Sequence, residues 1–158
     1  MKNIARYDSP LGPLTLTADE QGLSGIFFAE PHTITGDNPI LTQAKQWLDA
    51  YFRGEKPDPA SIPLCLKGSP FQLLVWNRLL TIPYGESVTY GELAREIARH
   101  LGKQRMSAQA IGGAVGRNPI PILIPCHRVL GSGGSLTGYT GGLHIKIWLL
   151  THEGCPFR

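Results

Sequence analysis

The chain has 158 residues, of which 42% are hydrophobic and 17% are charged, and its formal net charge at pH 7 is +3. This length allows one ordinary domain or two small domains that share a core, and the composition is typical of a globular protein. No apolar run approaches the roughly 20 residues that cross a bilayer, and the first residues lack the apolar segment of a secretory signal. Three cysteines without framework spacing argue against a disulfide scaffold, so we expect a cytoplasmic protein with free thiols.

Charge divides unevenly between the two parts of the chain. Residues 1–66 carry five Lys or Arg and eight Asp or Glu, whereas residues 67–158 carry ten and four. A basic C-terminal part is typical of a protein with a polyanionic partner. Ordinary variation among surface residues explains the same difference equally well.

The N-terminal part combines short strands with one helix. Apolar and β-branched runs predict strands over residues 4–7, 14–18 and 23–28. Asn38-Pro39 then begins a helix, with Asn38 as the N-cap and Pro39 at the first helical position, and Gly54 can end it. Residues 56–66 contain three prolines, so we interpret them as a linker and predict a first domain over 1–66 and a second over 67–158.

Three capping signals predict helices in the second part. Ser69-Pro70 repeats the combination of cap and proline, and Thr89-x-x-Glu92 is a capping box for a helix that runs to about residue 98. Ser107 can cap a further helix over about 108–116. Two short helices with a connection between them favour a helix-turn-helix, although many such pairs never touch DNA.

The predicted helix over 108–116 consists mostly of small residues. Glycine lowers helix stability, so a thin helix must serve another purpose. Tight packing on a neighbouring element and close approach to a nucleic-acid backbone explain it equally well. The small residues are Ala108, Ala110, Gly112, Gly113, Ala114 and Gly116.

The segment 118–129 delivers a cysteine and a histidine after an apolar run. Prolines at three positions limit residues 120–124 to a short edge strand or an extended segment. Adjacent residues on extended backbone point to opposite sides, so Cys126 and His127 should not touch directly and a water would have to bridge them. Taken alone, a buried cysteine followed by a polar turn explains the pattern as well.

The last part of the chain holds two glycine-rich loops and a helix. The loops cover 131–134 and 137–142, and neither is followed by the Gly-Lys-Ser/Thr of a phosphate-binding loop. A final helix is predicted over 143–152, with Gly154 at its end.

A thiol is a useful nucleophile at neutral pH only when a base or a nearby positive charge promotes the thiolate. Cys126 has His127 beside it, and Glu153 could orient that base. Cys65 in the linker and Cys155 in the tail are competing thiols with less rigid settings. Cys126-His127 lacks the paired spacing of a metal site, so we predict no metal and no cofactor.

A set of motifs in one order resembles the O6-alkylguanine–DNA alkyltransferases, which repair DNA by a suicide reaction. The resemblance covers residues 69–154 and is specific as a set, whereas the first 66 residues match only in general layout. The motifs are Phe71-Gln72 with Val75-Trp76, Ile82-Pro83-Tyr84-Gly85, Tyr90-Gly91-Glu92-Leu93-Ala94, Gly112-Gly113-Ala114, Asn118-Pro119, Pro125-Cys126-His127-Arg128-Val129, Gly138-Tyr139-x-Gly141-Gly142-Leu143 and Lys146-x-x-Leu149-Leu150-x-x-Glu153-Gly154.

This resemblance implies the fold and the reaction. The fold would be α+β, with a small ribonuclease-H-like sheet and helix packed on a mainly helical, winged helix-turn-helix-like domain. The reaction would be irreversible transfer of the alkyl group from O6-alkylguanine, and less well O4-alkylthymine, to Cys126. The partner would be the minor groove of double-stranded DNA, from which the base is flipped, and the protein would act as a monomer. The first 64 residues contain no cysteine for the N-terminal zinc site of some relatives.

The resemblance also implies roles for individual residues. Cys126, a water, His127 and Glu153 would form the relay, and Asn118 would hold the active-site turn. Tyr90 would displace the 3′ phosphate, Tyr139 would donate to guanine N3, Thr140 would meet O6 and the Val129 carbonyl would accept from the amino group. Lys146 would polarise or position the relay, and Arg128 would brace the domain interface.

One position departs from the family pattern. An intercalating arginine usually precedes the small-residue helix core, and here Gln109 occupies its place. The connection over 100–106 is also longer than is typical, so base extrusion is the step that this departure affects. The remaining DNA contacts are expected from Arg105, Ser107, Ala110, Gly112 and Arg117.

Three other functions remain open from the sequence. A lesion-binding module of the same fold would recruit another repair system, but such relatives lack the nucleophilic cysteine. A helix-turn-helix regulator would need an effector domain, and a cysteine hydrolase would turn over. The mass of the protein after exposure to alkylated DNA separates them.

Overall fold

The computed structural model describes residues 2–36 and 38–158, and no helix within these ranges is long and apolar enough to cross a membrane. The chain forms two compact units. One runs to Lys67 and also includes Pro119–Pro121, and the other consists of Gly68–Asn118 and Ile122–Arg158. The boundary predicted after residue 66 places Pro119–Pro121 in the second part, whereas the chain returns to the first unit for these three residues.

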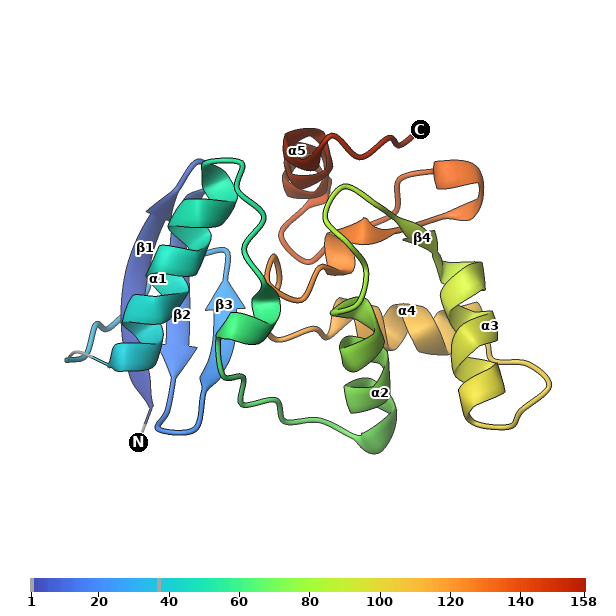
Figure 1. The fold of residues 1–158 in the computed structure, drawn as a ribbon, viewed down its shortest axis with the longest axis horizontal. Helices are drawn as coiled ribbons and strands as arrows, with labels where there is room; N and C mark the ends of the chain where they lie inside the picture. Colours follow the sequence, from blue (N-terminus) through green and yellow to red (C-terminus); the bar gives the residue numbers. More distant parts are fainter. Residues whose placement is uncertain (1, 37) are drawn as a thin grey trace. The chain divides into compact units, whose positions relative to one another are not determined.

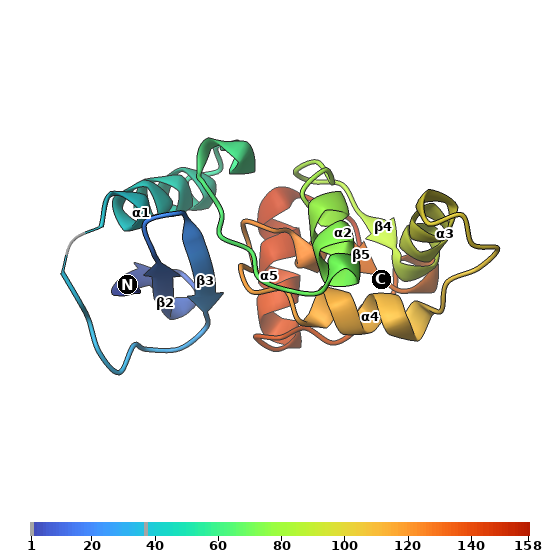
Figure 2. The same cartoon turned by 90° about the horizontal axis from the view of Figure 1, so that it is seen from below.

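The first unit is a three-stranded antiparallel sheet with a helix across one face (Figures 1 and 2). Strands β1 (Asn3–Ser9), β2 (Gly12–Ala18) and β3 (Leu23–Phe27) pair in chain order, and α1 (Pro39–Phe52) packs on them. Alternate strand residues and one stripe of α1 are buried, as the two periodicities require. These buried residues include Leu14, Leu16, Ile26, Leu41, Ala44 and Leu48.

Local signals set the limits of α1. The Asn38 side chain accepts a hydrogen bond from the Ile40 N–H at 2.8 Å, and Pro39 needs no partner at the first helical position. After the helix, Gly54 adopts a φ of 85°, which a residue with a Cβ rarely adopts. The sequence prediction for this helix is confirmed at both ends.

The segment predicted as a linker is part of the first unit. Leu64 forms a parallel bridge with Leu23 of strand β3. The Leu23 N–H donates to the Pro63 carbonyl at 2.8 Å. A Cβ at Gly22 would lie 2.7 Å from the Leu64 carbonyl carbon, so glycine allows the two segments to approach. A short 3-10 helix, η1 (Pro59–Ser61), precedes this bridge.

The second unit is mainly helical. It contains α2 (Pro70–Leu79), α3 (Tyr90–His100), α4 (Ala108–Gly116) and α5 (Leu143–Glu153). Helix α4 packs against both α2 and α3, and the buried Trp76 indole N–H donates to the Ala114 carbonyl at 2.8 Å. The α+β fold class predicted from the sequence is therefore confirmed.

Two details of this unit differ from the prediction. Helix α3 continues to His100 rather than ending near residue 98, and Arg99 and His100 are favourable in a last helical turn because they complement its negative end. Strands β4 (Val88–Thr89) and β5 (Val129–Leu130) pair in parallel, and at two residues each they are too short to give a periodic signal.

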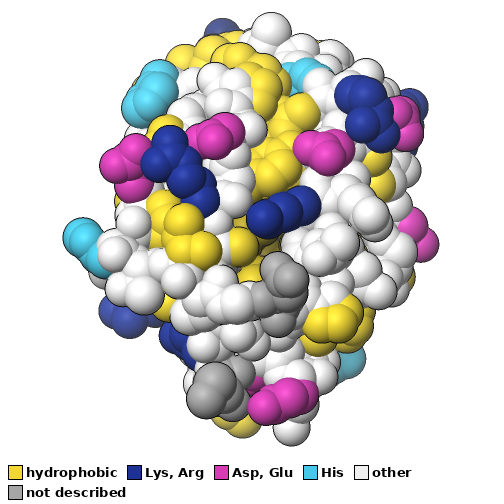
Figure 3. All heavy atoms as spheres, turned by 90° about the vertical axis from the view of Figure 1, so that its left-hand side faces the viewer, with side chains coloured by type: hydrophobic (Ala, Val, Ile, Leu, Met, Phe, Trp, Pro, Cys, Tyr) yellow, Lys and Arg dark blue, Asp and Glu magenta, His cyan; other side chains and the backbone are white. Residues whose placement is uncertain are grey.

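Charges of both signs are mixed on the face drawn in Figure 3, with apolar side chains among them. In the first unit, Arg6 pairs with Asp8 at 2.9 Å and with Glu30 at 3.0 Å, and Arg53 pairs with Glu55 at 2.6 Å. Three of the eight acidic residues of 1–66, Asp8, Glu30 and Glu55, are thus paired with arginines of the same unit.

Candidate active site

Residues 122 and 123 form a turn between single bridge residues at 121 and 124, so the prediction of a continuous edge strand or extended segment over 120–124 is wrong. The prolines remove N–H groups that a sheet ladder would use. The Asn118 side-chain amide donates to the Ile124 carbonyl at 2.7 Å, which closes the turn on itself. Ile122, which is buried, adopts a φ of 75°, a rare conformation for a β-branched residue that concentrates at functional sites.

Cys126 begins a short 3-10 helix, η2 (Cys126–Arg128), instead of ending a strand. Its backbone N–H donates to the Ile124 carbonyl at 2.8 Å, so the nucleophile candidate is fixed to the preceding turn. Because the backbone is not extended here, the alternation from which opposite orientations of Cys126 and His127 were expected does not apply.

The Cys126 thiol is buried, with 3% of the residue exposed. Burial raises the pKa of this thiol, whereas hydrogen bonds from the Asn118 and Tyr139 side chains and the charge of Lys146 act in the opposite direction. The surroundings therefore disfavour a resting thiolate but hold three groups that would stabilise one.

A cavity of about 270 Å³ lies against Cys126. Residues of helix α4, of the start of α3 and of the glycine-rich loop over 137–142 line it. Four residues predicted to act on the substrate or the DNA line this cavity together with Cys126. They are Tyr90, Gly112, Tyr139 and Thr140.

His127 lies against Glu153 in the interior. The His127 Nε2 atom and the Glu153 Oε2 atom are 2.6 Å apart, and both side chains are fully buried. Burial lowers the pKa of His127 in spite of its carboxylate partner. If Nε2 donates to Glu153, the other nitrogen, Nδ1, carries the lone pair, and it has no hydrogen-bond partner among the described residues. Such an imidazole can accept a proton.

Glu153 is also bound by Arg128. The Arg128 Nε and Nη2 atoms donate to the two carboxylate oxygens at 2.8 and 3.0 Å, and Nη1 donates to the Ile82 carbonyl at 2.6 Å. Burial alone would raise the pKa of Glu153, but the hydrogen bonds and charges of His127 and Arg128 bring it well below its usual range. All these contacts of Arg128 lie within the second unit.

The backbone around Gly85 also supports Glu153. The Gly85 N–H donates to Glu153 Oε1 at 3.1 Å, and Gly85 has a φ of 79°. A Cβ at Gly85 would lie 3.1 Å from the Glu153 carbonyl oxygen, so the approach is close. Gly154, with a φ of 69°, ends α5 directly after the carboxylate. The contribution of Gly85 was not predicted, because the glycine of a turn carries no local sign of a distant partner.

Lys146 is fully buried on α5 and connects several groups. Its Nζ donates to the Val129 carbonyl at 2.8 Å and to the Thr137 hydroxyl at 3.1 Å. Burial lowers its pKa to about 8. The Thr137 hydroxyl donates to the Tyr90 hydroxyl at 3.3 Å, so this threonine, to which no sequence motif assigns a role, links α5 with the start of α3.

The residues expected to contact DNA lie on or beside α4, outside the cavity except for Gly112. The Ser107 hydroxyl caps α4 by accepting from the Ala110 N–H at 2.9 Å. Gln109 and Ala110 are exposed on the first turn of the helix, and Arg117 is exposed at its end. Arg105 is exposed in the loop before the helix.

The glycines of α4 do not serve tight packing. A Cβ at Gly112, Gly113 or Gly116 would meet nothing within 4 Å. Of the two explanations for the thin helix, packing on a neighbour is thus removed for these three positions. The open surface leaves the approach of another molecule as the explanation.

The other two thiols lie in different settings. The Cys65 Sγ is 3.8 Å from the Gln21 side-chain oxygen in the first unit, and Cys155 is buried with Leu130 and Leu150. Burial raises the pKa of both thiols. Among the described residues, no group of three or more His, Cys, Asp or Glu side chains could hold a metal ion.

The comparison with known protein families agrees with this site. Residues 70–155 match the model of the "6-O-methylguanine DNA methyltransferase, DNA binding domain", and residues 4–66 match the "6-O-methylguanine DNA methyltransferase, ribonuclease-like domain". The chain therefore belongs to the family of 6-O-methylguanine DNA methyltransferases, which confirms the resemblance seen in the motifs.

Individual relatives are similar over almost the whole chain. The methylated-DNA–protein-cysteine methyltransferase of Methanosarcina acetivorans is 43% identical over 157 residues, which cover 95% of this chain and 97% of that protein. The crystal structure of the Mycobacterium tuberculosis O6-methylguanine methyltransferase has a TM-score of 0.81 at 41% identity, covering 98% of this chain and 93% of that one. A crystal structure of OGT from the same organism in complex with DNA has a TM-score of 0.79 at 42% identity, covering 96% and 93%.

Proposed function

We propose that the protein repairs DNA by moving the alkyl group of O6-alkylguanine, and less efficiently of O4-alkylthymine, onto the sulfur of Cys126. The main observation in support is the buried thiol of Cys126, which borders a cavity of about 270 Å³. The next residue, His127, contacts the carboxylate of Glu153. Membership of the 6-O-methylguanine DNA methyltransferase family supports this substrate class.

The reaction needs a thiolate, and His127 is the base that can produce it. The proton leaves the Cys126 sulfur through a bridging water and reaches the unpartnered Nδ1 of His127. Glu153 holds the opposite nitrogen and stabilises the imidazolium that forms. The Asn118 amide and the Lys146 charge then stabilise the sulfur anion.

Transfer occurs in a single displacement. The Cys126 sulfur forms a bond to the alkyl carbon as the bond between that carbon and guanine O6 breaks. The electron pair goes to the guanine, which takes up one proton and is restored. The product on the protein is a thioether, which is not reversed, so each molecule acts once.

The cavity residues suit recognition of a guanine. Tyr139 donates to N3, and the backbone at Thr140 meets O6. The Val129 carbonyl accepts from the guanine amino group with its second lone pair, since Lys146 already donates to this oxygen. Tyr90, at the start of α3, displaces the 3′ phosphate so that the nucleotide rotates outward.

Helix α4 enters the minor groove of duplex DNA in this proposal. The base must leave the stack to reach Cys126, and Gln109 fills the gap that it leaves. The open glycine surface of α4 permits close approach of the backbone. Contacts to the duplex also come from Arg105, Ser107, Ala110, Gly112 and Arg117. The protein works as a cytoplasmic monomer without a cofactor.

Intact-mass measurement after exposure to excess methylated and benzylated DNA tests this function. We expect one stoichiometric mass gain, which peptide mapping places on Cys126, and no gain for Cys126→Ser although that variant still binds DNA. An alkyl group on Cys65 or Cys155 would contradict the assignment. DNA binding without any gain would indicate a lesion-binding module, and repeated product formation would indicate a hydrolase.

A further inference from the structure

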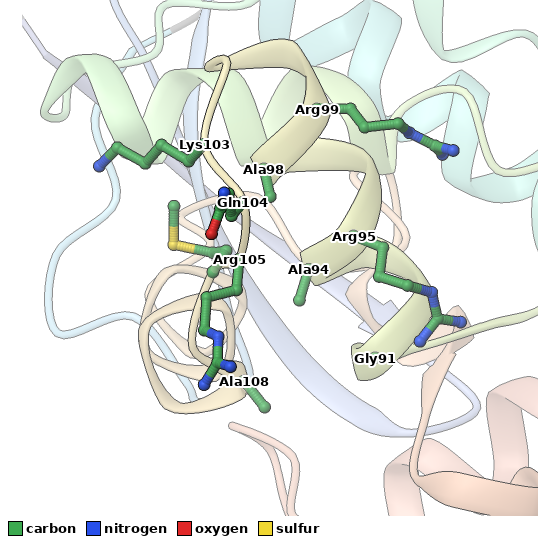
Figure 4. Close-up of a pocket in the computed structure, with 10 residues that line it drawn as sticks. Gly91, Ala94, Arg95, Ala98, Arg99, Lys103, Gln104, Arg105 and Ala108 are labelled. Carbon is green, nitrogen blue, oxygen red and sulfur yellow. The ribbon is translucent and has the colours of Figure 1, made fainter.

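A second hollow of about 410 Å³ lies on the second unit between α3 and the loop over 101–107 (Figure 4). It shares no lining residue with the cavity at Cys126. We call it the basic groove and define it by Ala94, Arg95, Ala98, Arg99 and the loop residues 103–106, with Gly91 and Ala108 as further lining residues.

The floor of the basic groove is apolar. Ala94 and Ala98 lie one helical turn apart on α3, and both are largely buried at 6% and 3% exposure. Met106 lines the groove from the loop side. Because Ala94 and Ala98 place only methyl groups on the floor, the space between helix and loop stays open.

The rim carries positive charge on both sides. In Figure 4 the side chains of Arg95 and Arg99 extend from α3 on one side of the alanines, and Lys103 and Arg105 lie on the other. All four residues are exposed, and within the ranges that the structure describes none of them forms an ion pair.

An arginine on the neighbouring helix α2 does form an ion pair with a carboxylate of this unit. Arg78 forms a two-pronged ion pair with Glu96 of α3, and its charge is therefore compensated. In the described part of the chain none of the four cations of the groove forms such a pair, although the charge of Arg99 also acts on Glu96. The groove also adjoins the start of α4, where the first N–H groups lack intrahelical acceptors and favour an anion.

The chemistry of floor and rim points to one occupant. A nucleic-acid strand alternates apolar sugars with anionic phosphates, and the groove offers an apolar floor between two rows of cations. Its residues all lie within the segment 70–155 that matches a DNA-binding domain. We propose that the basic groove binds the sugar–phosphate backbone of the duplex beside the lesion, as a contact separate from the approach of α4. This inference rests on the proposed function for its partner, because it assumes that the protein works on DNA.

The test is the salt dependence of DNA affinity. Each cation that contacts a phosphate contributes about 0.9 to the slope of log affinity against log salt concentration. The variant Arg95→Gln/Arg99→Gln/Lys103→Gln should therefore have a slope shallower by about two to three units. Its loss of affinity should be about 100-fold or more at about 0.1 M salt and should shrink as the salt concentration rises. The duplex should carry one lesion and be long enough for a single protein molecule.

Two matched variants complete the design. Lys2→Gln/Lys45→Gln/Lys56→Gln removes the same charge from the first unit and should leave the slope unchanged. Arg95→Lys/Arg99→Lys keeps the charge and should retain most of the slope. Thermal unfolding midpoints of all variants should match the parent, since the substituted side chains of α3 and the loop are exposed.

Equal salt slopes for the parent and the groove variant would overturn the inference. An equal decrease in slope for the groove variant and the first-unit variant would overturn it as well. A decrease in slope that is seen only with duplexes long enough for two protein molecules would also overturn it. In that case the groove would contact a neighbouring protein molecule instead of DNA. Transfer from free O6-benzylguanine by the parent tests the proposed function separately, because no DNA is present. If the parent protein transfers the benzyl group from the free base, but the parent and the groove variant have equal salt slopes, the proposed function is supported and the groove contact is contradicted.

Discussion

Glu153 is a buried carboxylate that contacts two buried side chains, His127 and Arg128, and burial together with these charges sets the state of His127. Burial lowers the pKa of His127 and favours the uncharged imidazole at rest, and the guanidinium of Arg128, which donates to both oxygens of Glu153, acts in the same direction. A neutral imidazole is the form that accepts a proton. An imidazolium is stabilised by the carboxylate but opposed by the neighbouring guanidinium, so the protonated state is suited to a transient role.

Replacing Glu153 by glutamine removes the negative charge beside His127 but keeps a side chain that can still hydrogen-bond to the imidazole. Glu153→Gln should slow alkyl transfer by at least about tenfold, because the imidazolium loses its counter-charge. It should also lower the free energy of unfolding by about 3–5 kcal/mol, because Arg128 stays buried without its carboxylate. Single-turnover rates and denaturant midpoints measure the two effects.

A matched control exists on α3. Glu96→Gln breaks the more exposed pair with Arg78, whose side chains are 28% and 32% exposed for Arg78 and Glu96, and should cost about 1 kcal/mol or less. Its transfer rate should equal that of the parent. If Glu153→Gln also reacts at the parental rate, Glu153 has no part in the mechanism.

Stability should depend on pH through the same residues. The folded pKa of His127 is lowered, so the unfolded chain binds its proton more readily and stability falls as the pH drops below about 6.5. The folded pKa of Glu153 is also lowered, so its contribution is present above about 4.3 and is lost as the pH falls toward the folded value. Denaturant midpoints across this range should show both losses, and Glu153→Gln should lack the second. A flat profile from neutral to acidic pH would contradict both assignments.

Helix α4 combines an open glycine surface with an exposed polar residue at its first turn. Nothing within 4 Å would meet a Cβ at Gly113, so the helix can accept alanine there without repacking. Gly113→Ala should raise the free energy of unfolding by about 0.5–1 kcal/mol, since alanine is the better helix former.

Gly112→Ala is the companion change, because Gly112 lines the cavity at Cys126. It should give a similar gain in stability but slow transfer of a benzyl group more than transfer of a methyl group. Denaturant midpoints and the two transfer rates are the measurements. A loss of stability at Gly113 would show that the glycine surface is packed after all.

Gln109 tests the role of the first turn of α4. Extruding a base costs a few kcal/mol, and a side chain that fills the gap offsets part of this cost. Arginine would add stacking and phosphate attraction that a neutral glutamine lacks, so Gln109→Arg should raise the ratio of the rate on duplex DNA to the rate on free benzylguanine. Gln109→Ala should lower that ratio. Three equal ratios would show that another side chain fills the gap.

Across the whole molecule, the features predicted well are those with local causes. The caps at Asn38, Ser69, Thr89 and Ser107 each satisfy N–H groups within three residues, so the starts of four helices are evident from the sequence. The turn before Cys126 is different, because prolines suit both an extended edge and a turn. The bond between the Asn118 side chain and the Ile124 carbonyl and the positive φ of Ile122 distinguish the two, and both depend on the folded backbone.

The candidate site was predicted residue by residue from motifs, but its geometry was not. No spacing rule brings Glu153 against His127 across 26 positions, and this pairing was expected only from the family resemblance. The support from Gly85 and the bridge through Thr137 have no sequence signal at all. The roles in DNA contact and catalysis stay predictions until the variants are measured.

The return of Pro119–Pro121 to the first unit has a consequence for how the gene can be divided. The Ile26 N–H donates to the Pro119 carbonyl at 3.0 Å, so the sheet unit depends on residues encoded some fifty positions beyond its apparent end at Lys67. A truncation at that point would yield an N-terminal fragment without this partner and a C-terminal fragment with three residues foreign to it. No single cut in the gene separates the two units completely. We therefore expect that a chimera of two relatives joined within residues 56–66 folds less stably than either parent, because its sheet unit would receive residues 119–121 from the other relative.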